Sequence, residues 1–211
     1  MTYSDRIAIY SLGNSNIILY PDSGQSYHPS WHSDGRKVVF DSNVSFLKKP
    51  NSLHLLDLIN YTITLITING DPITAKMPVW HPFDDVIYYQ TWINSELCIN
   101  RLIIDSSKTE IVVKSVSTKY KDLSYPCVSP DGTELLFVDN LQIWKTYIDG
   151  TGRKRLTDEG GRYPSWSPDG KEIVFTASDV ESGASIGVLW KMNSDGSNKR
   201  QITFISDTNI E

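Results

Sequence analysis

The chain has 211 residues, of which 39% are hydrophobic and 21% charged, enough for one domain or one array of repeats with a buried core. Its formal net charge is −5, which excludes the basic surface that a nucleic acid or an anionic membrane would require. The longest charge-free stretches, Ile7–Pro21 and Leu58–Gly70, are shorter than the ~20 apolar residues of a membrane-spanning helix. We therefore expect no nucleic-acid partner and no membrane span.

The N-terminus, Met1–Arg6, lacks a basic segment followed by an apolar one. As written, the sequence predicts a cytoplasmic protein, or a periplasmic one if an export signal has been removed. Two cysteines, Cys98 and Cys127, are too few for a disulfide scaffold or a four-thiolate zinc site. No cofactor is expected.

In chain order, two short strands come first, at Ile7–Tyr10 and Asn16–Tyr20, and a 13-residue segment then recurs four times. The copies are His28–Phe40, Met77–Tyr89, Tyr125–Phe137 and Tyr163–Phe175. Their prolines are 49, 48 and 38 residues apart, a period typical of propeller blades with four strands each.

Each copy predicts two buried strands around a turn. In the fourth copy Trp166 precedes Ser-Pro-Asp-Gly, whose Pro, Asp and Gly favour a turn, and Ile173–Phe175 follows it. A second hairpin follows each copy. These hairpins are Leu53–Leu56 with Leu65–Thr67, Leu97–Asn100 with Glu110–Val113, Leu141–Lys145 with Arg155–Thr157, and Val188–Lys191 with Gln201–Thr203.

No segment keeps a helical period, so the expected fold is an all-β propeller of four-stranded antiparallel blades, forming a single domain over 1–211. About four and a half blades are visible, with approximate bounds 6–24, 25–70, 75–115, 123–158 and 161–204. The chain is then part of a larger ring, a five-bladed ring with one thin blade, or an arc completed by another subunit; we favour the first. Unpaired blade edges would permit self-association.

The fourth copy, with Leu-Trp-Lys-Met-Asn-x-Asp-Gly at 189–196 and Gln-Ile-Thr at 201–203, resembles the WD-like repeat of TolB-type β-propellers. The resemblance covers roughly residues 6–204. It departs at Phe83-Asp84-Asp85, which lacks Gly, and at Val128, where Trp is usual. It implies a non-catalytic scaffold for protein or ligand binding. The alternatives in that family are a metal-assisted sugar-acid lyase or hydrolase and the gating propeller of a larger peptidase.

The residues that precede the four prolines form the expected binding surface, because the resemblance places their strands around the propeller axis. The candidate binding residues are His28, Lys76, Tyr125, Arg162 and Tyr163. Such side chains suit polar, partly stacked recognition of a protein or peptide, with a carbohydrate as the alternative ligand. The competing interpretation is that a tyrosine before proline packs under the neighbouring blade.

No catalytic residue is expected. Gly183–Gly187 matches G-x-S-x-G, but every histidine precedes Ser185, whereas the hydrolase base follows its nucleophile; a Gly/Ser loop is the better interpretation. His28, His32 and His81 are a weak alternative metal set. Two of these histidines share a repeat position with serines in other copies, which indicates a tolerant turn entry.

Five tryptophans that recur in register are expected in the core. They are Trp31, Trp80, Trp144, Trp166 and Trp190. Trp92 lies outside that register and is expected at the surface. Arg153–Arg155 and Lys199-Arg200 are expected as solvated edges of outer hairpins, and Cys127 as a small buried residue.

Overall fold

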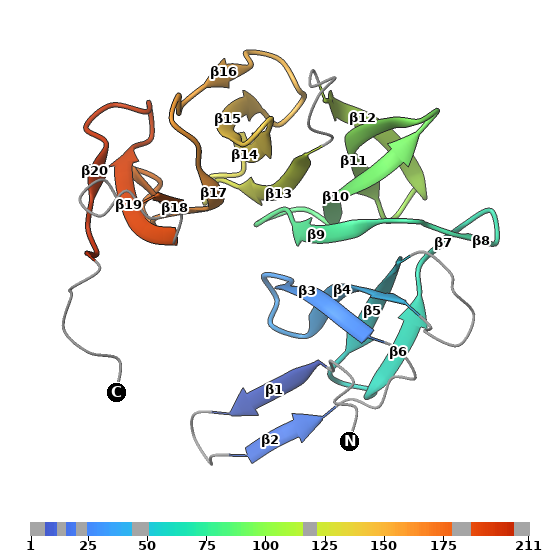
Figure 1. Ribbon diagram of the computed structural model, residues 1–211. Coiled ribbons are helices and arrows are strands. Elements are labelled where there is room, and N and C mark those ends of the chain that lie inside the picture. The colour runs from blue at the N-terminus through green and yellow to red at the C-terminus, as the bar shows by residue number, and fades with distance from the viewer. Residues whose placement is uncertain are drawn as a thin grey trace. The chain divides into compact units, whose positions relative to one another are not determined.

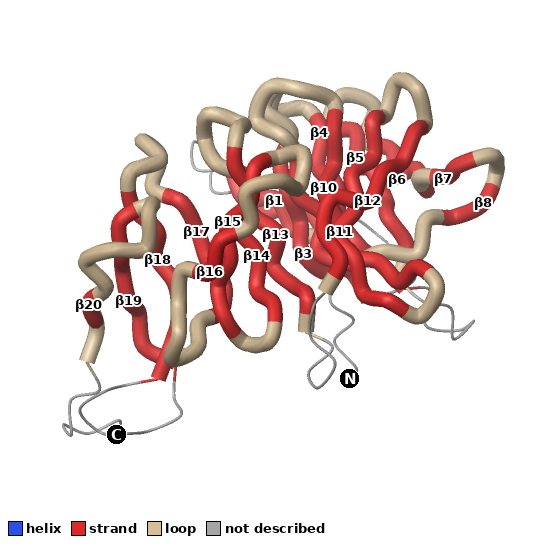
Figure 2. Tube along the Cα trace, turned by 90° about the horizontal axis from the view of Figure 1, so that it is seen from above, coloured by secondary structure: helices blue, strands red, loops and turns tan. Residues whose placement is uncertain are grey.

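The computed structural model describes residues 7–11, 16–19, 25–43, 51–115, 122–178 and 187–204. Throughout these residues the secondary structure is strand, with turns and irregular segments between (Figure 2). No helix long and apolar enough to cross a membrane is found among them. The chain divides into two compact units, Met1–Ile111 and Val112–Glu211.

The first unit contains a short hairpin and two four-stranded antiparallel sheets (Figure 1). The hairpin pairs β1 (Ala8–Ser11) with β2 (Asn16–Leu19). Blade 25–65 consists of β3 (Gln25–Trp31), β4 (Lys37–Asn43), β5 (Ser52–Asp57) and β6 (Thr62–Leu65). Blade 76–114 consists of β9 (Lys76–Trp80), β10 (Val86–Ile93), β11 (Glu96–Ile103) and β12 (Lys108–Lys114), and the unit boundary falls within β12.

The second unit repeats this arrangement twice. Blade 123–155 consists of β13 (Leu123–Val128), β14 (Glu134–Asp139), β15 (Gln142–Tyr147) and β16 (Lys154–Arg155). Blade 162–201 consists of β17 (Arg162–Trp166), β18 (Glu172–Ser178), β19 (Gly187–Asn193) and β20 (Arg200–Gln201). In all four blades the strands pair in chain order, as expected for propeller blades.

One hairpin was not expected. The sequence predicts a strand over Leu65–Thr67, but β6 ends at Leu65, and β7 (Thr67–Ile68) pairs with β8 (Asp71–Pro72). Asn69 and Gly70 form the connection with φ of 53° and 88°. Asn-Gly favours a tight hairpin turn with two left-handed residues, and this local preference ends the outer strand early.

The turn chemistry inferred from Ser-Pro-Asp-Gly is confirmed. Asp131 accepts a hydrogen bond from the Thr133 main-chain N–H at 3.0 Å, and Gly132 has φ of 74°. The copy at 167–170 repeats this, with Asp169 accepting from the Lys171 N–H at 3.1 Å. Hydrogen bonds from the Ser129 and Ser167 hydroxyls, and then these main-chain hydrogen bonds, lower the pKa of the two carboxyl groups.

The core lies between neighbouring sheets of each unit. In the first unit, side chains of blade 25–65, among them Val39 and Leu53, pack with Ile87 and Tyr89 of blade 76–114. In the second unit, Val138 and Ile143 of blade 123–155 pack with Ile173 and Phe175 of blade 162–201. The apolar runs therefore bury both faces of the blades, as their lack of alternation predicted.

The prediction that five tryptophans lie in the core is wrong for Trp31, whereas Trp80 belongs to the core and Trp166 and Trp190 pack against it. Only Trp80 is fully buried; Trp144, Trp166 and Trp190 are half-buried, and Trp31 is 52% exposed. Trp80 and Trp166 each contact a preceding four-stranded blade, through Ser30 Oγ and the Cys127 carbonyl respectively. Among the described residues only the β1–β2 hairpin precedes the blade of Trp31, so less surface covers it.

The expectation for the outer-hairpin cations is wrong at one position. Lys154, Arg155, Lys199 and Arg200 are exposed, but the Arg153 side chain is only 21% exposed and pairs with the fully buried Asp139 at 2.5 Å. Its long side chain reaches back across the blade, a contact that residue spacing along the strand does not reveal.

Candidate functional site

The residue before each repeat proline has the same unusual backbone conformation. His28, Met77, Tyr125 and Tyr163 have φ of 49°, 53°, 54° and 52°. A residue before proline normally prefers an extended backbone, and non-glycine residues rarely adopt positive φ. The pairing of each first strand, β3, β9, β13 or β17, with the next strand shifts register at this point. The repeat therefore places a left-handed bulge at one fixed position in all four blades.

In the first unit, Asp41 connects two of these bulges. Its side chain is fully buried on β4, and Oδ1 lies 2.7 Å from His28 Nδ1 and accepts from the Met77 main-chain N–H at 3.1 Å. Oδ2 accepts from Asn51 Nδ2 at 2.6 Å. Because the Asp41 carboxylate can only accept this hydrogen bond, Nδ1 of His28 carries the hydrogen. The imidazole, 39% exposed, is thus held in one orientation.

Lys76 adjoins this arrangement at the start of β9. It is exposed and makes no ion pair with any described residue. With Asn51, Gln90 and Trp92 it lines a cavity of about 310 Å³. Trp92 is 50% exposed, which confirms its expected place at the surface.

In the second unit, Tyr125 and Tyr163 form an aromatic pair across β13 and β17. Their ring centroids are 4.3 Å apart and the planes are inclined by 55°. Burial, and then the hydrogen bond with Tyr163, raise the pKa of Tyr125 to about 12, whereas the Tyr163 side chain is largely exposed. The more buried phenol of Tyr125 thus contacts the exposed phenol of Tyr163.

Arg162 lies beside this aromatic pair. It is exposed, and its guanidinium lies 3.7 Å from the Asp122 carboxylate. Asp122 Oδ1 accepts from the Ser124 hydroxyl at 2.8 Å. The structure thus brings Tyr125, Arg162 and Tyr163 together in the second unit, and it places His28 and Lys76 in the first.

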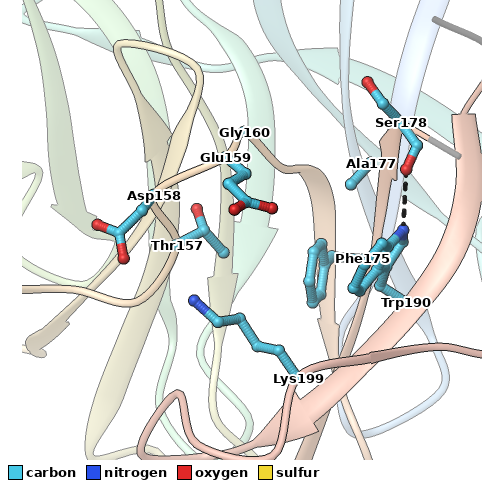
Figure 3. Close-up of a pocket in the computed structure, with 9 residues that line it drawn as sticks. All are labelled: Thr157, Asp158, Glu159, Gly160, Phe175, Ala177, Ser178, Trp190 and Lys199. Carbon is cyan, nitrogen blue, oxygen red and sulfur yellow. Dashed lines mark hydrogen bonds between the residues drawn. The ribbon is translucent and has the colours of Figure 1, made fainter. Parts of the chain in front are cut away.

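A second cavity, of about 350 Å³, lies in the second unit between the β16–β17 connection and blade 162–201 (Figure 3). Phe175 and Trp190 stack on one side of it, with centroids 6.4 Å apart. Glu159 and Lys199 line the other side, with Trp190 donating to the Ser178 carbonyl at 3.2 Å. No motif in the sequence pointed to this cavity.

His32 and His81 accept main-chain hydrogen bonds within their own turns and do not form a site with His28. Nδ1 of His81 accepts from the main-chain N–H groups of Phe83 and Asp84 at 3.3 and 3.1 Å. Nδ1 of His32 accepts from the Asp34 N–H at 3.3 Å. These rings replace the serine that enters the turn in the other two copies.

The described residues contain no group of three or more His, Cys, Asp or Glu side chains that could hold a metal ion. The alternative set His28, His32 and His81 is therefore not brought together. The Cys127 thiol is held protonated, because burial raises its pKa. Residues 183–186 of the G-x-S-x-G match lie outside the described residues.

Comparison with known proteins finds solved structures that have the same fold. No protein-family model matches the chain. A 62-residue part is 36% identical to an uncharacterized protein of Agrobacterium fabrum, covering 26% of this chain and 21% of that protein. The chain is similar in structure to TolB from Acinetobacter baumannii, with a TM-score of 0.75 and 18% identity over 94% of this chain and 49% of TolB.

A further similar structure is an oligogalacturonate lyase in complex with manganese, with a TM-score of 0.67 and 15% identity over 99% of this chain and 61% of that one. The chain spans about a fifth of its sequence relative and about half of the TolB structure. At these identities the similarity concerns the fold alone. The four-stranded blades and these neighbours together show that the chain has a TolB-like β-propeller fold.

Proposed function

We propose that this chain is a non-catalytic β-propeller that binds a protein or peptide through side chains at the bulges of its first strands. The observation that carries this proposal is the left-handed residue before each of the four prolines. Such a conformation costs about 1–3 kcal/mol per non-glycine residue, and it recurs with His, Met, Tyr and Tyr. The backbone is constant while the side chain varies, as expected if each side chain is selected for what it contacts.

The chemistry of these positions supports recognition rather than bond breaking. Tyr125, Arg162 and Tyr163 offer two phenols in contact and a guanidinium, groups that are frequent among residues dominating protein interfaces. His28 and Lys76 offer an oriented imidazole and an ammonium group. The thiol of Cys127 is protonated and half-buried, which is unfavourable for a nucleophile.

Selection and binding experiments test this proposal. A random peptide library displayed on phage is selected on the immobilised protein, and the enriched peptide is titrated by calorimetry against wild type and the double variant Arg162→Ala/Tyr163→Ala. We expect at least about a tenfold loss of affinity, because interface Tyr and Arg truncations typically cost more than 1–2 kcal/mol.

A matched control comes from the outer part of the same unit. Tyr147→Ala/Arg155→Ala removes the same residue types at exposed positions and should leave the affinity within a factor of about two. An equal loss in both double variants, or failure of the library to enrich any peptide, would contradict the proposed function.

A further inference from the structure

The two blades of the second unit can be compared position by position. In blade 123–155, Phe137 pairs with Trp144, and in blade 162–201, Phe175 pairs with Trp190. The guanidinium of Arg153 lies over the first pair, 4.9 Å from the Phe137 centroid and 4.5 Å from that of Trp144. In blade 123–155 the Phe–Trp pair therefore binds a guanidinium group that comes from the same chain.

The same cation is anchored by an acid. Arg153 Nη2 lies 2.5 Å from Asp139 Oδ2, and Nη1 donates to the Lys114 carbonyl at 3.0 Å. Two rings, one buried carboxylate and one carbonyl thus surround a single guanidinium. This combines a cation–π contact with a charge-assisted hydrogen bond.

Blade 162–201 keeps the rings but changes the other two groups. Lys145 pairs with Lys154 and Lys191 with Arg200, so Lys199 stands where blade 123–155 has Arg153. Counting from the aromatic pair, Ala177 stands where that blade has Asp139. The ammonium of Lys199 donates to the Leu156 carbonyl at 3.3 Å, and the cavity of about 350 Å³ lies over Phe175 and Trp190.

Two acidic side chains line this cavity, and they differ in whether they form an ion pair. Asp158 is paired with Arg155 at 2.7 Å, whereas Glu159 makes no ion pair with any described residue. Figure 3 shows the Glu159 carboxylate beside the cavity and the Lys199 ammonium on the side of Thr157, away from the two rings.

We infer that this cavity binds a guanidinium group supplied by a ligand, with Phe175 and Trp190 beneath it and Glu159 as its counter-ion. An arginine side chain of a peptide and free arginine share this chemistry. The inference does not depend on the proposed function, because none of these residues lies at a first-strand bulge.

Calorimetric titration with blocked amino acids tests the inference. Nα-acetyl-arginine amide should bind at least about fivefold more tightly than the citrulline analogue, which has the same shape without the charge. Tighter binding of Gly-Gly-Arg-Gly-Gly than of free L-arginine would identify a peptide as the source, and the reverse order a free amino acid. Equal affinity for the arginine and citrulline analogues would overturn the inference.

Three variants locate the site. Glu159→Gln should weaken binding of the arginine analogue severalfold, whereas Asp158→Asn, next to it but already paired, should change it little. Ala177→Asp/Lys199→Arg copies blade 123–155, so its own guanidinium should cover the rings, abolish binding and raise the thermal unfolding midpoint. If this double variant folds, as judged by circular dichroism, and binds like wild type, the assignment is wrong.

Discussion

Arg153 shows how one side chain can carry both packing and charge. Its guanidinium contacts two aromatic rings and neutralises Asp139, which is fully buried. Removing one partner of a buried ion pair leaves an uncompensated charge and costs about 3–5 kcal/mol. We therefore expect Arg153→Ala to lower the free energy of unfolding, measured by urea denaturation, by about that amount.

Arg155 is the matched control, because its ion pair with Asp158 is exposed on both sides. Exposed pairs contribute at most about 1 kcal/mol, so Arg155→Ala should have little effect. If both alanine variants unfold at the same urea concentration, Arg153 does not have the buried role described above.

The Tyr125–Tyr163 pair makes a prediction at alkaline pH. The pKa of Tyr125 rises from 10.0 to about 12, first through burial and then through the hydrogen bond with Tyr163. The folded protein therefore holds a proton that the unfolded chain releases, so this contribution to stability is intact below pH 10 and is lost as pH rises toward 12. Absorbance titration of the tyrosinates should show a late phase that contains Tyr125 together with Tyr88 and Tyr89, whose pKa burial also raises.

Tyr163→Phe keeps the ring and removes the hydroxyl, so the Tyr125 part of the late phase should move to lower pH. A titration in which every tyrosine ionises near pH 10, or in which this variant leaves the late phase unchanged, would contradict the described pairing.

The sequence predicted residue chemistry better than residue contacts. Cys127 and the turn aspartates occupy the kinds of environment expected from their repeat positions. The burial of Trp31 was predicted wrongly because burial depends on the neighbouring blade, and the ion pair of Arg153 was missed because the side chain crosses two strands. Neither effect is encoded in local spacing.

At the scale of elements, the bulge before proline is the feature that most affects the candidate site. Tyr163 is largely exposed with φ of 52°, so its backbone can be tested with little change in packing. A β-branched residue is strongly disfavoured at positive φ, whereas Asn tolerates it. We expect Tyr163→Val to be about 1–2 kcal/mol less stable than Tyr163→Asn in thermal or urea unfolding.

Both variants lose the same ring contact with Tyr125, so the difference between their unfolding free energies reports the cost of the backbone conformation at residue 163. Equal stability, or a more stable valine variant, would show that residue 163 has an extended conformation.

Strand order and turns could be predicted from apolar runs separated by Ser-Pro-Asp-Gly. The left-handed residues could not, because the residue before a proline favours extended backbone and Met and Tyr carry no preference for positive φ. The recurrence of a bulky non-glycine residue before Pro in one register, His, Met, Tyr and Tyr, was the signal available. The β7–β8 hairpin, in contrast, could have been predicted, because Asn69-Gly70 favours a tight hairpin turn. This turn ends β6 at Leu65.

At the scale of the whole molecule, the turn aspartates act together because three of the four blades repeat them, with Asp34, Asp131 and Asp169 each accepting from a main-chain N–H. The pKa of Asp131 is lowered from 3.8 by the Ser129 hydroxyl and then by the Thr133 N–H, and that of Asp169 by Ser167 and then Lys171. The folded state favours the ionised carboxylates, so their contribution to stability is present above about pH 4 and is lost as pH falls below it.

Asp131→Asn/Asp169→Asn should therefore flatten the dependence of the unfolding temperature on pH between pH 2 and 5, measured by calorimetry. An unchanged acid limb would show that these turns do not contribute to acid sensitivity.

The repeat period of the sequence was sufficient to predict the all-β propeller, since it reflects blades that must pack side by side. That residues 1–211 form a single domain stays a prediction. The binding surface of His28, Lys76, Tyr125, Arg162 and Tyr163 also stays a prediction, because repeat position fixes where a side chain begins and not what it meets.

Peptide binding at the first-strand bulges can be located by hydrogen–deuterium exchange with and without the library-selected peptide. Bound peptide should slow exchange most in the first strands of the second unit, β13 (Leu123–Val128) and β17 (Arg162–Trp166), and leave β16 and β20 nearly unchanged. Protection confined to the outer strands, with β13 and β17 exchanging as in the free protein, would contradict binding at these bulges.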